Sequence, residues 1–426
     1  MTAILLFAKD PAAVQGIEEA ECGFGAAGMG NKGAVGLRVT WANTAGVDDS
    51  SDSGELGKPT ELTFVATHLA AMEWNLQKRN SNWRTIVSGL TFANPKALLP
   101  GVFPANQSAA PPDMSGNGDK HAPAAANSAD SSELEEEIDD VEEAMAADTH
   151  PLLETQQQQP LHPNHPDLAP EDCATLQDVS IFKATSHLFV AGDLNYRISS
   201  STPPPLAPFP SFDPESENYY PVFLPRDQLT QERLAGRAFH GMSEAPIRFG
   251  PTYKYNVLCG GADVDKATNA DAVRRGDQVN GVTEVPWKFA PHRWPGWCDR
   301  VLYLDLPSWL SGRASITVLA YDAMPVVRTS DHRAVFLRAL VPVVGPEAMR
   351  PPPLQVAEAD AAAKMDPRVT PPIPVDVHAW ERRAAARNRE IIVGWSAFLW
   401  STREGAVVLA TLVALGVGSW WLWSVW

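Results

Sequence analysis

A short strand that ends in two closely spaced polar residues constrains this chain more than any other feature. Residues 186–191 are mostly apolar and include β-forming residues, so they predict a buried strand that ends at Gly192. Asp193 and Asn195 follow two residues apart, which places their side chains on one face of an extended segment. The acid could orient a water molecule and the amide could donate to a phosphate oxygen. An Asx turn after the strand explains the same two residues without any chemistry.

Polar side chains also fall next to other predicted strands, at His68, Lys254, Asp299, Asp331 and His332. One such residue is most often structural, whereas several in one predicted sheet suggest convergence on a single pocket. Together they supply carboxylates, imidazoles, an amide and a cation, which suits metal-assisted hydrolysis of a phosphoester. No serine or cysteine is framed by a base, so covalent catalysis is less well supported.

A glycine-rich segment at residues 22–36 carries Asn31 and Lys32, which could face an anion because glycines allow close backbone approach. It is not a Walker loop, since neither Ser nor Thr follows the lysine and a strand comes next. A tight hairpin turn explains the segment equally well. Elsewhere strands dominate, starting with an apolar run at residues 3–8, and residues 73–90 predict an amphipathic helix. This pattern favours packed sheets with helices outside.

The acidity of the chain is local. Of the formal net charge of −17, residues 101–178 contribute −16, from 17 acids against Lys120 alone. Composition predicts a disordered acidic insertion at residues 95–178, either a protein-binding tract or a solvated spacer, and a second, loop-like insertion at residues 260–285. The remainder is nearly neutral and lacks a basic stripe, which argues against nucleic acid as a partner. The four cysteines have no paired spacing, which argues against zinc and a disulfide framework.

The C-terminal region predicts a membrane anchor at residues 391–426, after a Pro/Ala-rich linker at residues 343–390. Residues 405–426 are uncharged over roughly 33 Å of helix, long enough to span a bilayer, and four tryptophans lie at the far end. A buried core helix is the alternative. Arginines in front of the span place the preceding chain in the cytosol, and residues 391–400 could lie along the interface. The moderate hydropathy and basic flank favour the endoplasmic reticulum.

Six stretches resemble one known family and occur in its order. They are GMGNKGAVG (28–36), THLAA (67–71), GDLNYR (192–197), PTYKY (251–255), WCDR (297–300) and SDH (330–332). On these motifs the chain resembles the inositol polyphosphate 5-phosphatases of the endonuclease/exonuclease/phosphatase superfamily, over residues 1–342 apart from the insertions. The resemblance implies a four-layer α/β sandwich of the DNase I-like type, with two packed, mostly antiparallel sheets flanked by helices, followed here by the C-terminal transmembrane helix.

The resemblance also implies roles for the residues that match its motifs. Asp193 would orient or activate the attacking water, and Asn195 would stabilise charge on the phosphoryl oxygens. His68 would contact the scissile phosphate. His332, held by Asp299, would be an acid–base partner of that phosphate.

Further residues are implied for the metal and for the substrate. Asp331 would lie on the side of a Mg²⁺ ion. Lys254 and Tyr253, with Lys32 and Asn31, would bind the neighbouring 4-phosphate. Tyr253 could instead only pack, and Asp299 could form a buried pair with Arg300.

The implied function is magnesium-dependent removal of the 5-phosphate from phosphoinositides such as phosphatidylinositol 4,5-bisphosphate at a membrane surface, leaving the 4-phosphate. One departure from the family pattern concerns the start of the chain. Fewer residues precede the glycine loop than the family has, and the Glu that serves as principal magnesium ligand has no counterpart. Glu18, Glu19 and Glu21 lie too close to Gly28 to replace it. We therefore expect an N-terminally incomplete catalytic domain; the alternative is a catalytically inactive phosphoinositide-binding or scaffold protein.

Overall fold

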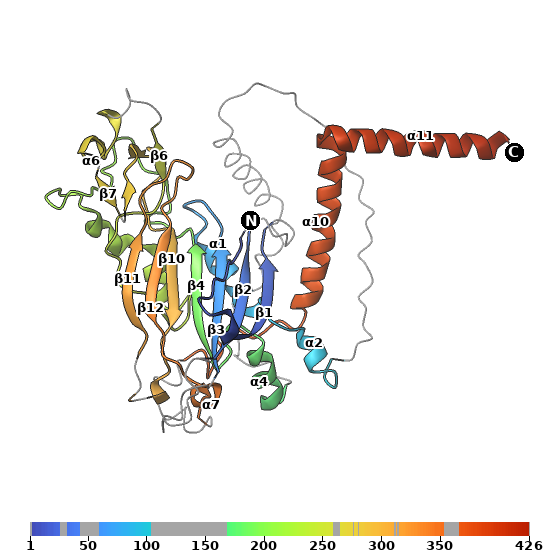
Figure 1. Ribbon diagram of the computed structural model, residues 1–426, viewed down its shortest axis with the longest axis horizontal. Helices are drawn as coiled ribbons and strands as arrows, with labels where there is room; N and C mark the ends of the chain where they lie inside the picture. Colours follow the sequence, from blue (N-terminus) through green and yellow to red (C-terminus); the bar gives the residue numbers. More distant parts are fainter. Residues whose placement is uncertain are drawn as a thin grey trace.

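The computed structural model describes residues 2–25, 32–42, 59–103, 168–258, 265–275, 277–279, 281–310, 312, 315–352 and 366–425. Figure 1 shows a sheet-rich body with two long helices at its C-terminal end. The central element is a six-stranded sheet in the order β1-β2-β3-β4-β10-β5. Its strands are β1 (Val14–Gly23), β2 (Gly33–Trp41), β3 (Thr60–His68), β4 (Ser186–Asp193), β10 (Asp299–Leu304) and β5 (Met242–Ser243). β3 and β4 are parallel, and all other neighbours in this sheet are antiparallel.

Helix α1 (Leu76–Gly89) covers one face of this sheet. The helix has an apolar stripe, and Trp83, Ile86 and Val87 on it are almost fully buried against strand residues such as Val65 and Val190. The Trp83 ring stacks on Phe239 at a centroid distance of 4.2 Å, and its Nε1 donates to His240 Nδ1 at 3.1 Å. The amphipathic helix predicted at residues 73–90 is thus confirmed and lies over the main core.

The other face of the sheet is covered by an antiparallel pair, β11 (Thr317–Ala323) and β12 (Val335–Leu340). Phe189, Tyr303 and Ile316 form the buried centre of this contact. Leu340, on the opposite face of the pair, is 59% exposed. The predicted α/β class with packed, mostly antiparallel sheets is confirmed. Within the described ranges the layers run α1, six-stranded sheet, β11–β12 pair.

Shorter elements complete the fold. They are the 3-10 helices η1 (Pro11–Ala13), η3 (Tyr220–Arg226) and η5 (Ser308–Leu310), the helices α2 (Pro95–Leu98), α4 (Pro170–Asp178), α5 (Gln228–Leu234), α6 (Ala270–Arg275) and α7 (Pro346–Met349), and the strand pairs β6 (Tyr255–Val257) with β9 (Trp287–Phe289) and β7 (Gln278–Val279) with β8 (Val282–Thr283). The predicted loop insertion at residues 260–285 therefore contains a short helix and a hairpin.

The strand predicted at residues 3–8 is wrong. This segment has no strand structure, and Leu5 and Phe7 are 79% and 87% exposed. The partner of β2 is instead β1, whose sequence mixes acids with apolar residues. An apolar run favours burial, but a strand also requires backbone pairing with a neighbour, and β1 makes this pairing with β2 while residues 3–8 make none.

Disorder is also wrong at both ends of the predicted acidic insertion. α2 and α4 are ordered there, and Leu99 and Leu176 pack into one apolar cluster with Val375 and Val377. The cluster joins segments far apart in the sequence, so the local composition of each segment could not predict this packing. Residues 104–167 of the predicted insertion lie outside the described ranges.

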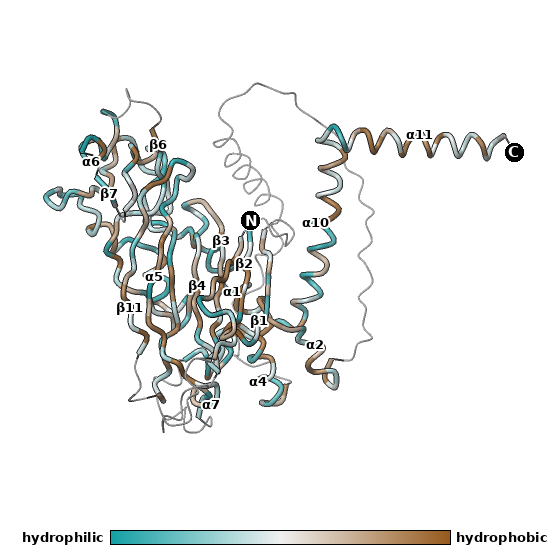
Figure 2. The backbone as a smooth tube through the Cα atoms, viewed as in Figure 1, coloured by the Kyte–Doolittle hydropathy of each residue, from teal (hydrophilic) through white to brown (hydrophobic). Residues whose placement is uncertain are grey.

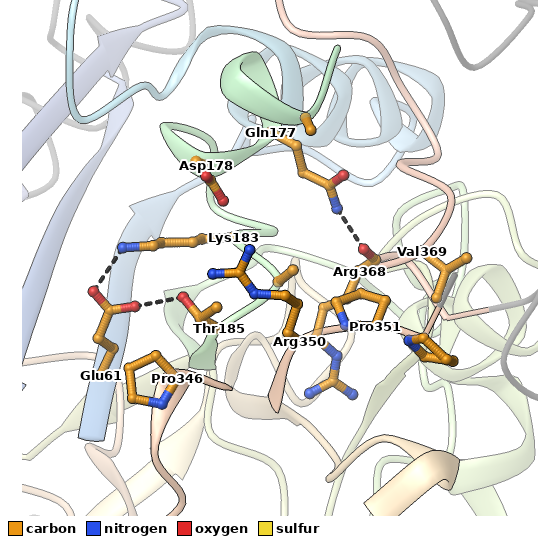
Figure 3. Close-up of a pocket in the computed structure, with 13 residues that line it drawn as sticks. Glu61, Gln177, Asp178, Lys183, Thr185, Pro346, Arg350, Pro351, Arg368 and Val369 are labelled. Carbon is orange, nitrogen blue, oxygen red and sulfur yellow. Dashed lines mark hydrogen bonds and ion pairs between the residues drawn. The ribbon is translucent and has the colours of Figure 1, made fainter. Parts of the chain in front are cut away.

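Of the predicted linker at residues 343–390, the described parts 343–352 and 366–390 make contacts with the domain. The Thr60 hydroxyl donates to the carbonyl of Val344 at 2.6 Å, and Gln177 Nε2 donates to the carbonyl of Arg368 at 2.7 Å. Figure 3 shows the second of these bonds beside a cavity of about 440 Å³, where Lys183 and Thr185 bind the Glu61 carboxylate. This cavity lies where β3 and β4 begin.

Two helices end the chain, α10 (Ala379–Ser401) and α11 (Arg403–Val425), separated by a bend at Thr402. Residues Arg403–Ser424 have a mean hydropathy of 1.8 and are largely exposed, so by length and composition this helix could cross a membrane. The first half of α10 is polar and its second half apolar (Figure 2). Only the first half packs on the domain, through Ala379 and Ala386.

We expect Trp83→Ala to destabilise the domain strongly, because this side chain of α1 is fully buried in the main core and stacks on Phe239. Removing such a ring costs about 3–5 kcal/mol in the free energy of unfolding, which corresponds to a midpoint lowered by roughly 6 °C or more. Trp74→Ala is the matched control, since Trp74 is 57% exposed. Thermal unfolding of the full chain in detergent, followed by near-ultraviolet circular dichroism, measures both; equal shifts would contradict the assignment of the core.

Candidate active site

Strand register brings three of the predicted residues into one row. His68 is paired with Asp193 across β3 and β4, and Asp193 with Asp299 across β4 and β10. Neighbouring strands are about 4.8 Å apart, so these side chains lie close together. They stand at one end of the strands, along the edge of the sheet where β3 and β4 end and β10 begins. The row continues to Gly33 of β2, which pairs with His68, and Lys32 precedes that glycine. Lys32 Nζ lies 3.4 Å from His68 Nε2.

Gly192 lets β3 and β4 pair next to the site. Its φ is 142°, a value that side-chain-bearing residues rarely adopt, and a Cβ there would lie 1.9 Å from the carbonyl oxygen of Thr67. Glycine is therefore required at this position. It allows β4 to continue to Asp193, its last residue.

The Asx turn is present, and it holds the carboxylate of Asp193. The backbone N–H of Asn195 donates to Asp193 Oδ1 at 3.0 Å. The amide Nδ2 of Asn195 donates to Asp193 Oδ2 and to the carbonyl of Leu69, each at 3.1 Å. Both amide hydrogens are thus engaged within the protein, which differs from the prediction that they face a phosphate. Asn195 is buried and positions Asp193.

Arg197 is a site residue that sequence reasoning did not single out. It is buried, and its guanidinium donates to both the side-chain and the main-chain oxygen of Asn195. It also lies over the Tyr253 ring, 4.4 Å from the centroid. Its spacing was the available signal, because Asp193, Asn195 and Arg197 alternate along the chain.

Two imidazoles converge on the same oxygen of Asp193. His68 Nε2 lies 3.4 Å and His332 Nε2 lies 4.0 Å from Asp193 Oδ2. The other ring nitrogen of His332, Nδ1, is 2.8 Å from Asp299 Oδ2. The predicted pairing of His332 with Asp299 is therefore present. Arg300 does not pair with Asp299, because its guanidinium is buried between Asp227 and Glu244.

The pKa values of the two histidines are shifted in opposite directions. Burial alone would lower the pKa of His332, but the hydrogen bond and charge of Asp299, with the charges of Asp193 and Asp331, raise it to about 9. Burial lowers the pKa of His68, and nearby Lys32 and His332 add to this effect against the attraction of Asp193. Near neutral pH the site thus offers one imidazolium that can donate a proton and one neutral imidazole.

The predicted substrate-binding residues lie beside this cluster. The Tyr253 ring is buried, 4.5 Å from the ring of His332, so packing is one role it fills. Lys254 Nζ lies 5.7 Å from the centroid of the Tyr253 ring and 3.5 Å from Asp331 Oδ2. Asn31 lies outside the described ranges. The structure therefore gathers a lysine and an aromatic ring on the His332 side and a second lysine on the His68 side.

A cation could be held by Asp193, Asp299 and His332. One ligand atom from each lies within 4.8 Å of the others. Asp331, predicted on the metal side, contacts Lys254 and is not part of this group. Two carboxylates suit a hard divalent cation that prefers oxygen ligands. On β1, Glu18 binds Arg38 and Glu21 binds Arg383, so neither reaches the group.

Comparison with known proteins identifies the family of the chain. The family model for "Endonuclease/Exonuclease/phosphatase family 2" matches residues 1–338. The chain belongs to this family. It is 26% identical over 321 residues to the type II inositol polyphosphate 5-phosphatase 15 of Arabidopsis thaliana, covering 74% of this chain and 20% of the relative. It is 31% identical over 159 residues to the phosphatidylinositol 3,4,5-trisphosphate 5-phosphatase 2B of Danio rerio, covering 37% and 11%.

Among solved structures, the inositol polyphosphate 5-phosphatase domain of a synaptojanin, in complex with inositol (1,4)-bisphosphate and calcium, aligns at a TM-score of 0.37. The two are 18% identical, and the alignment covers 89% of this chain and 64% of that one. The chain spans about a fifth or less of the two relatives named above. The family relationship therefore rests on the match to residues 1–338.

We expect Asp299→Asn to lower the pKa of His332 from about 9 toward or below its ordinary value of about 6.5. The folded-state pKa is raised, so His332 stabilises the fold fully below about pH 6.5, and this contribution is lost as the pH rises through about 9. NMR titration of the imidazole signals in EDTA, assigned with His332→Gln, measures the change. Asp322→Asn is the control, and an unchanged titration in Asp299→Asn would contradict the pairing.

Proposed function

We propose that this chain is a magnesium-dependent phosphatase that removes the 5-phosphate of a phosphoinositide, such as phosphatidylinositol 4,5-bisphosphate, at a membrane surface. The product keeps its 4-phosphate. The observation that carries the proposal is the convergence of His68 and His332 on Asp193 at one sheet edge. The relatives are named as inositol polyphosphate and phosphoinositide 5-phosphatases, which supports this reaction class.

Asp193 and His332 would each make one of the proton transfers of the reaction. Asp193 is held by Asn195 and can accept a proton from the water whose oxygen attacks phosphorus. As the bond between phosphorus and the inositol oxygen breaks, the imidazolium of His332 can donate a proton to the phosphate or to that oxygen. His68, with Lys32 next to it, contacts the scissile phosphate. Asn195 and Arg197 act through Asp193 and position it.

The carboxylates of Asp193 and Asp299 would hold the magnesium ion, because His332 as an imidazolium has no free nitrogen lone pair for a metal. When bound, such an ion neutralises charge on the phosphoryl oxygens and makes water more acidic. Lys254 would bind the neighbouring 4-phosphate, because a second phosphate requires a charge-assisted partner. Helix α11 would anchor the domain to the membrane with the domain in the cytosol, and the endoplasmic reticulum is the compartment we propose.

Binding without turnover is the competing proposal, as a phosphoinositide-binding or scaffold protein. It is favoured by one observation: Glu18 and Glu21 are paired with arginines away from the site, so the described cluster has two carboxylates and no glutamate. This proposal expects the full chain to bind phosphoinositide vesicles and to release no phosphate in the presence of Mg²⁺.

We expect Asp193→Asn to reduce phosphate release from phosphatidylinositol 4,5-bisphosphate by about 10²–10⁴-fold, since the amide cannot accept the proton of the attacking water. Malachite-green detection of phosphate, with Mg²⁺ and with EDTA, measures the rate. Asp322→Asn on β11 is the control. A wild-type chain that binds vesicles without releasing phosphate would favour the scaffold proposal, and an unchanged rate in Asp193→Asn would contradict the role of Asp193.

We expect Lys254→Met to raise the KM for a 4,5-bisphosphate roughly tenfold, because one charged contact to the 4-phosphate is lost. The KM for a substrate that carries only the 5-phosphate should stay the same. Lys288→Met, at an exposed position of β9, is the matched control. Equal changes in KM for the two substrates would contradict a contact to the 4-phosphate.

A further inference from the structure

A cavity lined by several arginines lies between α1, β1 and α10, outside the catalytic cluster. It has a volume of about 320 Å³, and Arg382, Arg383 and Arg389 of α10 line it. Small residues such as Gly23 of β1 and Gly89 of α1 form part of its wall. The lining carries three arginines against one acid, Glu21. This excess of positive charge suits an anionic ligand.

The helix that carries these arginines is fixed to the domain. Trp380 Nε1 donates to the hydroxyl of Thr91 at 3.0 Å, and the backbone N–H of Asp376 donates to the carbonyl of Ser88 at 2.9 Å. Arg383 Nε binds Glu21 at 2.8 Å, and Arg382 pairs with Asp376. The guanidinium groups are therefore held at the cavity wall by partners of their own. An anion would share them with these acids.

The cavity lies at the same edge of the sheet as the catalytic row. Gly23 pairs with Gly33, Gly33 with His68, and His68 with Asp193. Three strand spacings of about 4.8 Å separate Gly23 from Asp193, which is roughly 14 Å. A surface that meets the cavity is thus close to the catalytic residues as well.

Helix α10 passes this edge and becomes apolar beyond it. Figure 1 shows its second half projecting past the ends of β1 and β4, and Figure 2 shows that half as hydrophobic. Residues 391–400 carry no charge, and Ile392, Trp395 and Trp400 are 64%, 61% and 80% exposed. Arg389 lies two residues, about 3 Å of helix, before this apolar segment. Figure 1 shows α11 running across α10, so a bilayer that α11 spans would have this apolar segment along its interface, with the arginines at the level of the lipid headgroups.

We propose that this cavity binds the phosphate of an anionic phospholipid headgroup, and that this contact keeps the catalytic row close to the bilayer surface. The inference rests on the membrane location in the proposed function. A lipid fits better than a free phosphate, because its acyl chains would cover the exposed apolar half of α10 while its phosphate meets the arginines. Substrate headgroups in the same leaflet would then lie next to His68 and Asp193.

The test is native mass spectrometry of the full chain from detergent micelles with added phosphatidylserine. We expect a retained lipid in the wild type, and roughly tenfold weaker retention for Arg389→Gln, with a further loss when Arg382→Gln is added. Arg387→Gln is the matched control, since it removes the same charge from the same helix outside the cavity lining. Because Arg382 also pairs with Asp376, thermal unfolding of each variant checks the fold, and the single Arg389→Gln variant decides the outcome.

Equal losses in Arg387→Gln and Arg389→Gln would overturn the cavity as the site, because general surface charge would then explain the binding. Retention of soluble glycerophosphoserine as strong as that of the lipid would overturn the lipid assignment. So would unchanged retention in Arg389→Gln. Phosphate release is scored separately: a chain that keeps the lipid but hydrolyses neither lipid-borne nor soluble inositol phosphates refutes the proposed function and leaves the cavity site standing.

Discussion

The close parallel pairing of β3 and β4 is the constraint on which the site depends. At its end the Thr67 carbonyl approaches Gly192 so closely that only a glycine fits. This pairing sets His68 beside Asp193, and the antiparallel pairing of β4 with β10 adds Asp299. A shift of one residue in either register would turn these side chains to the other face of the sheet. Backbone hydrogen bonds between the strands thus determine how the side chains of the candidate site lie relative to one another.

Buried arginines leave the acids of the candidate site available to other partners. Arg300 follows Asp299 directly, yet Asp227 and Glu244 neutralise it, so Asp299 is left to His332. Arg197 binds the oxygen of Asn195, which leaves the amide hydrogens for Asp193 and Leu69. In both cases a cation in the core satisfies groups behind the site. Removing such a cation leaves buried acceptors without a partner, which costs more than the bond itself contributes.

Much of the site could be predicted from the sequence because its residues stand at strand ends, where an apolar run meets a polar one. This pattern identified His68, Asp193 and Asp299, and motif resemblance added their order. The direction of each side chain could not be predicted. Asn195 turns back to Asp193 and Asp331 turns to Lys254, since these directions depend on contacts with residues far away in the sequence, such as Leu69 for Asn195 and Lys254 for Asp331.

The fold shows the same division between local and long-range information. The period of α1 predicted its buried face, because the helix packs by its own pattern. Residues 3–8 are equally apolar, but they pair with no strand of the described sheet and remain exposed. The ends of the acidic insertion were read as disordered from composition, yet Leu99 and Leu176 are ordered by Val375 and Val377, about two hundred or more residues further along the chain.

The packing of residues 366–390 changes how a membrane anchor would act on the domain. A free linker would raise the local concentration of substrate and leave the orientation of the domain random. Here Trp380 binds Thr91, just after α1, and Arg383 binds Glu21 of β1, so the apolar half of α10 leaves the domain in one direction. That direction is past the catalytic edge. With a membrane anchor, the fixed helix α10 would orient the domain before substrate arrives, so less rotational entropy would be lost when a headgroup enters the site.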